Sequence, residues 1–336
     1  MVMNKEKGEA VSPTQFLLLL HSVPQIGEKA LARLIRLHSQ NRLSPEEFLT
    51  LDSQSFIERY ELQTVAAEYL ADNRSALLLE SSELARTLRL SEIQLLSVES
   101  ASYPKALDRY DDAPPPLIYT RGNQSLLALC SPKIVEQANA GEQAQQFIHS
   151  EYPTESGNAR FTYTIAVSNG ASAETLSKLE SISTDFVTQG GVPVTGHDRS
   201  PYKLLALTAQ RQNSPTFYVF DRGLREALGP RFDRAPFTAA RIRDAEFAVS
   251  RDLALSPFRL DDHSIGANNR RRDRLIFSLS QTIVALDVRA GGTMYSECLR
   301  ALRQGRSVFV TEGDQDGNQA LIEQGCPIYS SSRLKG

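Results

Sequence analysis

The sequence predicts an α/β protein in which a small all-helical domain precedes a doubly wound parallel sheet. Two observations carry this prediction. From residue 162 onward, short apolar runs bounded by glycine or polar turns alternate with helical patterns, which is typical of parallel strands joined by crossover helices. Before residue 90 the apolar residues recur at helical spacing instead, so we expect the chain to begin with helices.

The composition limits the class of protein. The chain has 336 residues, 41% of them hydrophobic and 23% charged, so it can bury an ordinary core in two or three domains. We expect a cytoplasmic protein without a membrane segment, because no apolar run approaches the ~20 residues of a membrane-spanning helix and no secretory signal is present. Three widely spaced cysteines argue against a disulfide framework or a zinc site. A net charge of −3 means that any nucleic-acid surface must be local.

Residues 1–10 are expected to be a disordered start, and residues 11–90 to form the helical domain. Ser12-Pro13 is typical of a helix start, and a break at Val23–Gly27 separates two helical patterns. Helix, P-x-I-G turn and helix form a helix-hairpin-helix or SAM-like pattern, whose second helix can offer N–H groups to a DNA phosphate. A packing module without DNA contact is the alternative, because the second glycine of a G-x-G hairpin is missing. We expect further helices at residues 44–51, 53–59, 64–79 and 82–86.

Residues 91–330 are expected to form the α/β domain, with residues 331–336 as a tail. A strand at 93–97 precedes a segment in which Pro104 starts a short helix, Ala113–Pro116 forces an extended chain and Leu117–Tyr119 forms a strand. Residues 123–160 carry no hydrophobic period, and we interpret them as a loop or insertion with partial helix at 138–149.

Strands and helices alternate through the rest of the chain. We expect strands at residues 162–167, 192–195, 216–220, 246–250, 282–287 and 307–310. We expect helices at residues 175–188, 202–211, 272–280, 295–304 and 319–324. This alternation predicts the parallel, doubly wound sheet.

The densest cationic stretch is Asn268–Ser280, where four arginines occupy five positions. It leads into a buried strand, a glycine turn and a helix start, an arrangement that favours an anionic ligand. Positive charge at a helix start is opposed by the helix dipole, which indicates an anionic partner; pairing with Asp261, Asp262 and Asp273 is the alternative. The predicted phosphate contacts are Asn269, Arg270, Arg271, Arg272, Arg274, Gly291, Gly292 and Thr293.

The motifs and their order resemble the DNA-processing protein A family (DprA, also called Smf). Residues 103–122 contain Y-P-x-x-L, D-x-P-P and L-x-Y-x-x-G in family order. Residues 272–280 (RDRLIFSLS) are similar to the family's R-N-R-I-I-A-G-L-S. Residues 216–224, 291–297, 304–310 and 317–325 follow its T-I-A-V-L-G-x-G-L, S-G-S-L-x-T-A, x-G-R-x-V-F-x and G-x-N-x-L-I-x-x-G. The resemblance covers most of residues 12–330 and implies an extended Rossmann domain.

The departures from the family pattern lie in the expected ligand loops. Ser168-Asn169-Gly170 replaces G-S-R, residues 195–201 shorten the S-G-x-A-x-G-I-D-x-x-A-H loop, and Ser250-Arg251 replaces S-E. Asn169, Gly170 and Arg199 nevertheless complete the predicted set of nucleic-acid contacts.

The resemblance implies a single-stranded DNA-binding protein of DNA uptake, natural transformation and recombination. It implies delivery of DNA to a RecA-type recombinase and homodimerisation, with no catalysis and no cofactor. Five histidines show no metal spacing, and we predict no catalytic residue. Two alternatives remain open: a ligand-free Rossmann scaffold that acts through protein–protein contacts, and a nucleotide-binding or nucleotide-hydrolysing protein. The second rests on Gly291–Thr293 with Glu297, which is similar to the G-G-x-G-T-x-x-E of nucleotide phosphoribohydrolases.

Overall fold

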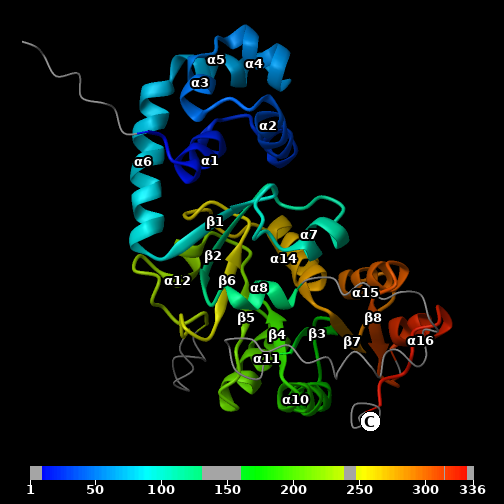
Figure 1. Ribbon diagram of the computed structural model, residues 1–336. Coiled ribbons are helices and arrows are strands. Elements are labelled where there is room, and N and C mark those ends of the chain that lie inside the picture. The colour runs from blue at the N-terminus through cyan, green and yellow to red at the C-terminus, as the bar shows by residue number, and fades with distance from the viewer. Residues whose placement is uncertain (1–9, 131–159, 238–246, 314, 331–336) are drawn as a thin grey trace, which may run out of the picture. The chain divides into compact units, whose positions relative to one another are not determined.

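The computed structural model describes residues 10–130, 160–237, 247–313 and 315–330. The chain divides into two compact units, the first formed by residues 1–103 and 115–117 and the second by residues 104–114 and 118–336 (Figure 1). None of the helices in the described ranges combines the length and the apolar character that a membrane crossing requires.

Helices make up most of the first unit. They are α1 (Pro13–Ser22), α2 (Glu28–Asn41), α3 (Pro45–Thr50), α4 (Ser53–Tyr60), α5 (Thr64–Asp72) and α6 (Arg74–Leu90), followed by strand β1 (Ile93–Ser97). The cap signals in the sequence are used: the Ser12 hydroxyl accepts the Gln15 N–H, and Ser44 forms a capping box with Glu47. The bounds of the two helices that we predicted at 64–79 and 82–86 are wrong. The chain leaves helical geometry at Asn73, which separates α5 from α6, and α6 then continues without a break from Arg74 to Leu90.

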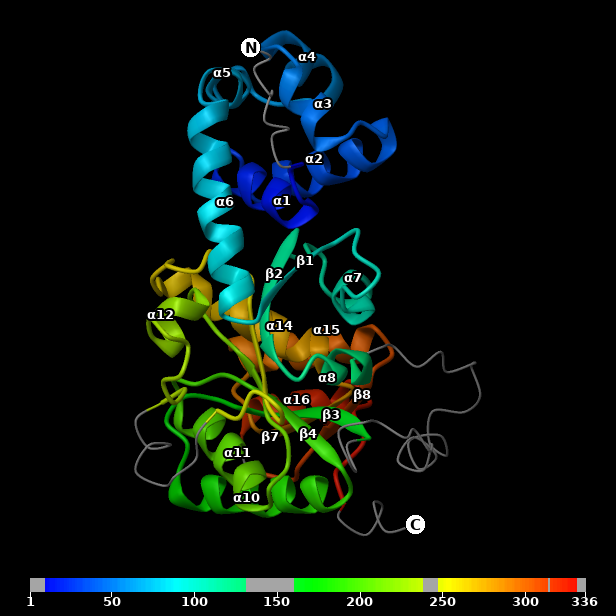
Figure 2. The same ribbon diagram turned by 60° about the vertical axis from the view of Figure 1, so that its left-hand side comes forward.

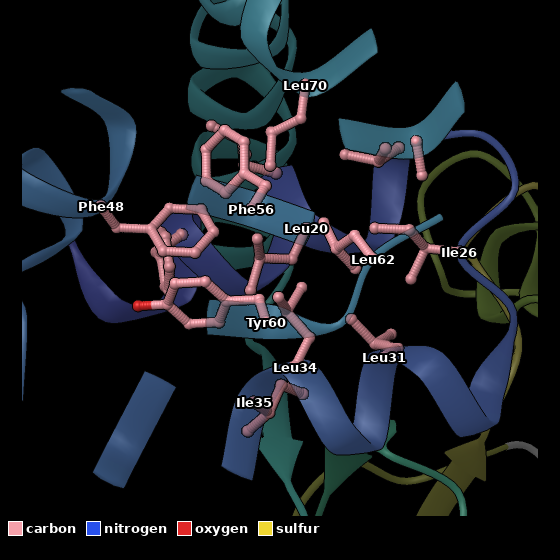
Figure 3. Packing of buried hydrophobic residues seen from close by; sticks show 14 of the residues in the cluster. Leu20, Ile26, Leu31, Leu34, Ile35, Phe48, Phe56, Tyr60, Leu62 and Leu70 are labelled. Atoms are coloured by element: carbon pink, nitrogen blue, oxygen red, sulfur yellow. The ribbon is translucent and has the colours of Figure 1, made fainter. Parts of the chain in front are cut away.

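A hydrophobic cluster of mostly aliphatic side chains, with four aromatic rings among them, forms the core of the first unit (Figure 3). The rings of Phe48 and Phe56 lie 5.0 Å apart, and Tyr60 packs edge-on against Phe48 at 4.9 Å. Ile26, in the turn between α1 and α2, is also buried in this core. The hairpin turn is therefore held by packing on its apolar side.

A doubly wound sheet organises the second unit. Its strands are β2 (Leu117–Gly122), β3 (Phe161–Val167), β4 (Gly191–Thr195), β5 (Phe217–Val219), β6 (Leu253–Ser256), β7 (Thr282–Asp287) and β8 (Ser307–Val310). They run in the order β2-β6-β5-β4-β3-β7-β8. Every pairing among them is parallel except β2 with β6, which pairs antiparallel with Tyr119 opposite Ser256.

Helices cover both faces of this sheet. On one face lie α10 (Ala173–Thr188) and α11 (Ser200–Arg211), and on the other lie α14 (Gly266–Leu279) and α15 (Thr293–Arg303), as Figures 1 and 2 show. The remaining helices are α7 (Lys105–Tyr110), α8 (Ser125–Leu129), α12 (Leu224–Leu228) and α16 (Asp316–Glu323). Between α10 and α11 on one side and the sheet on the other lies a core that includes Tyr163 and Ile165 of β3 and Phe186 of α10. The predicted fold class is confirmed, with an antiparallel strand at one end.

Two boundaries in this unit differ from the prediction by more than three residues. The strand expected at 246–250 is wrong: Phe247–Ser250 is irregular, and β6 begins at Leu253. The buried Asp252 carboxylate accepts the N–H groups of Thr216 and Ala248 and so closes a turn at this point. Helix α14 begins at Gly266 instead of Arg272, because the buried Asn268 side chain donates to the Asp221 carbonyl and anchors an additional first turn.

Two short helices, α8 and α12, were not predicted, since five residues are too few to show a period. The partial helix expected at 138–149 lies outside the described residues.

Candidate functional site

A cleft of about 540 Å³ lies at the carboxyl ends of β3, β4 and β7 and at the start of α15. The chain leaves β3 toward β4 on one side, while β7 pairs with β3 on the other, so this is the topological switch point where doubly wound proteins bind ligands. We call it the switch-point cleft. Its lining residues are Ser168, Asn169, Asp198, Arg199, Gly266, Asn269, Arg270, Arg272, Asp273, Arg289, Ala290, Gly291, Gly292, Thr293 and Met294.

The structure brings most of the sequence-predicted site residues together here. Those in the cleft are Asn169, Arg199, Asn269, Arg270, Arg272, Gly291, Gly292 and Thr293. Gly170, Arg271 and Arg274 do not line it. The residues come from four separate segments, so the cleft is assembled by the sheet and not by one motif.

The four clustered arginines point to different sides of helix α14. Arg271 bonds to the Asp111 carboxylate at 3.0 Å and to the Ala113 carbonyl at 2.7 Å. Arg274 faces Asp112 at 3.8 Å and Glu297 at 3.6 Å. Successive residues on a helix point about 100° apart, so adjacency in sequence does not give a shared surface.

The helix dipole does not oppose the charge of these four arginines, so the prediction of an anionic partner from the dipole is wrong. All four arginines lie beyond the first turn of α14, which begins at Gly266, and the dipole effect falls off within that turn. The alternative was that these arginines pair with Asp261, Asp262 and Asp273. It is correct for Asp273, which pairs with Arg272. Asp261 pairs with Arg225 instead, and Asp262 accepts the backbone N–H of Arg259.

Arg272 is a buried structural cation. Its side chain is 1% exposed and lies 2.7 Å from Asp198 and 2.9 Å from Asp273. A third carboxylate, that of Asp221, lies 3.8 Å away, and the guanidinium is 5.2 Å from the Tyr202 ring centre. Burial alone would lower the pKa of Arg272, but the surrounding negative groups, Asp273 first, raise it above its ordinary value. The charge of Arg272 is thus neutralised inside the protein.

A buried histidine lies beside this network. His197 is 9% exposed, its Nε2 atom lies 3.7 Å from Asp221, and its ring packs 5.0 Å from that of Phe220. Burial lowers the pKa of His197 to about 4, so it is neutral at pH 7 and adds no positive charge.

Three arginines of the cleft have no carboxylate partner among the described residues. Arg270 is exposed and has no hydrogen-bond or ion-pair partner there. Arg199 donates to the Asn169 side chain at 3.1 Å and stacks 4.4 Å over the Tyr202 ring, while its Nε is buried without a hydrogen-bond partner. Arg289 donates to the Asn169 carbonyl at 2.5 Å. These three guanidinium groups retain their charge for an external anion.

Arg289 was missed by the sequence reasoning. It lies two residues after β7 in the D-V-R-A-G-G stretch, so its place at the carboxyl end of a strand was the signal that could have found it.

The glycine turn supplies backbone donors next to these arginines. Gly291 adopts a positive φ of 72°, and Gly292 is the N-cap of α15 with no side-chain cap. The first N–H groups of an uncapped helix have no intrahelical partner, and the dipole there favours negative charge. Glu297 does not offer a free carboxylate beside this turn, since it is 7% exposed and bonds to Arg300 at 2.6 Å.

These features define a Rossmann-like α/β protein with a cationic cleft at its switch point. No family model and no curated protein sequence matches the chain. Solved structures do match its fold. The X-ray structure of DNA processing protein A from Streptococcus pneumoniae is 16% identical, with 96% of this chain and 97% of that chain covered and a TM-score of 0.66.

A second match is DNA processing protein A from Helicobacter pylori, whose structure was described for its single-stranded DNA binding mode. It is 17% identical, covers 73% of this chain and 95% of that chain, and has a TM-score of 0.50. The chain therefore has a DprA-like fold, in which helices precede a Rossmann-like unit.

Proposed function

We propose that this chain is a DprA-like DNA-processing protein that binds single-stranded DNA through the switch-point cleft. The carrying observation is that Arg199, Arg270 and Arg289 converge there without a carboxylate partner among the described residues. Arginine forks match phosphate oxygens in geometry as well as in charge. Contacts to phosphate groups carry no information about the bases. We therefore expect binding without strong sequence preference.

The fold likeness to two DprA structures supports this proposal, one of them described for its binding of single-stranded DNA. From the family resemblance we further propose that the chain works in natural transformation and recombination in the cytoplasm, as a non-enzymatic homodimer that delivers DNA to a RecA-type recombinase. Light scattering would test the dimer. Faster assembly of a RecA-type recombinase on single strands coated by a single-strand-binding protein would test the delivery.

Salt dependence of binding tests the cleft directly. For single strands, log K falls against log salt with a slope of about −0.7 for each phosphate neutralised. Arg270→Gln and Arg289→Gln should each weaken binding of an oligo-dT and reduce the slope by ~0.7. Fluorescence anisotropy at several salt concentrations measures both quantities.

Arg303→Gln is the matched control. It removes the same charge from an exposed position at the far end of α15, about 15 Å along the helix from the cleft. We expect the slope of this variant to equal that of the unmodified chain. If all three variants behave alike, the cleft is not the DNA site and the proposed function falls.

A further inference from the structure

The charge of the switch-point cleft is small and closely confined. Four arginines line it, but so do Asp198 and Asp273, which leaves a net of two positive charges. Arg272 is already balanced by these carboxylates, so the available charge lies on Arg199, Arg270 and Arg289. Such a site differs from a long basic groove that tracks a backbone over many nucleotides.

The size of the cleft agrees with this confinement. A volume of about 540 Å³ lies in the range of pockets that hold one drug-sized ligand. A single-strand-binding groove, in contrast, covers roughly 4–16 nucleotides for each module. The cleft therefore fits a single nucleotide.

A phosphate monoester matches the available charge better than an internal phosphodiester. The monoester carries about −1.5 to −2 at pH 7, whereas each internal phosphate carries one negative charge. The Asp198 side chain is 29% exposed on the cleft wall, where it would repel the next phosphate of a strand that continues through the site.

We propose that the switch-point cleft binds one nucleotide through a terminal phosphate monoester, either at the end of a DNA strand or on a free nucleoside monophosphate. Binding of a DNA strand end, which we call the strand-end form, specifies the proposed DNA-binding function further and rests on it. Binding of a nucleoside monophosphate is the free-nucleotide form. Arg270, on α14, and Arg289, two residues after β7, both line the cleft and hold the terminal phosphate. Asp198 selects against internal stretches.

The test compares oligonucleotides that differ only at one end. An oligo-dT with fluorescein on its 3′ end is prepared with a 5′-hydroxyl or a 5′-phosphate, and a second pair carries fluorescein on the 5′ end with a 3′-hydroxyl or a 3′-phosphate. Circular single-stranded DNA and thymidine monophosphate serve as unlabelled competitors. We expect a terminal phosphate to tighten binding about tenfold, as one charge-assisted contact would. Thymidine monophosphate should remove this gain, whereas circular DNA should compete no better than the hydroxyl oligonucleotide.

Variants assign the effect to the cleft. Arg270→Gln and Arg289→Gln should abolish the tenfold gain, and Arg303→Gln should retain it. Equal binding of phosphorylated, hydroxyl and circular DNA would overturn the inference while the proposed function stands. Binding of thymidine monophosphate without binding of any DNA would overturn the proposed function and the strand-end form, and would support the free-nucleotide form. Binding of neither overturns both.

Discussion

Replacement of Arg272 by methionine separates structural from ligand-binding arginines in the α14 cluster. Methionine keeps much of the volume of the side chain but removes its charge. The substitution removes the cation that lies within 4 Å of Asp198 and Asp273, whereas Asp221 keeps Arg222 at 2.9 Å. Asp273 is only 5% exposed, so water cannot replace its lost partner.

The expected cost follows from this burial. Removing one partner of a buried ion pair costs about 3–5 kcal/mol, because a charge is left uncompensated. For an α/β unit of this size, that loss corresponds to a fall in Tm of roughly 6–20 °C. The matched substitution Arg270→Met removes an exposed arginine without a described partner, and it should change stability by less than about 0.5 kcal/mol.

Urea unfolding followed by circular dichroism measures the difference between the two variants. Uptake of a proton removes the charge of a buried carboxyl group that has lost its cation. The added cost is therefore largest near neutral pH and becomes smaller as the pH falls. Arg272→Met should thus be closer to the unmodified chain at pH 5 than at pH 7.5. Equal stability of the Arg272 and Arg270 variants at pH 7.5 would refute the structural role of Arg272.

Three further perturbations test other parts of the structure. Asn318→Ala should cost about 3 kcal/mol or more in urea unfolding, because the fully buried amide bonds the Val288 N–H and two carbonyl groups; a cost near zero would contradict this. Burial lowers the pKa of His197 to about 4 from an unfolded value near 6.5, so the unfolded chain binds more protons between these values and stability falls as the pH falls. Between pH 7 and pH 4, His197→Gln should therefore lose on the order of 3 kcal/mol less stability than the unmodified chain. The same pH profile for both proteins would contradict a buried, neutral His197. The three buried thiols should resist a thiol reagent in the native chain and react in denaturant, while rapid native reaction would show that their sites open.

The fold could be predicted from the sequence because its strands are marked locally. Buried parallel strands such as β3 and β7 appear as apolar runs of six or seven residues closed by polar or glycine turns. The errors occurred where a tertiary contact decides the boundary. Asp252 closes the turn before β6 through Thr216, which lies 36 residues earlier, and no local pattern reports such a bond.

The sequence was sufficient to locate the candidate site, but not to assign a role to each of its arginines. Arginine density identified α14, and the glycine turn identified the start of α15. The sequence did not show that Arg272 faces the core while Arg270 faces the cleft, because the acids that decide this come from distant segments: Asp198 after β4 and Asp221 after β5. Side-chain roles on one helix depend on what packs against each face.

The switch-point cleft also shows how neighbouring strand ends share the supply of positive charge. Asn169, after β3, contacts arginines from the ends of two neighbouring strands. Arg199, after β4, donates to its side chain, and Arg289, after β7, donates to its carbonyl. Parallel strands deliver their carboxyl ends to a single edge of the sheet, so a cation lost from one strand end can be supplied from the next at nearly the same place. The charge of such a cleft is therefore a property of the edge as a whole, and the loss of one motif residue does not by itself remove the site.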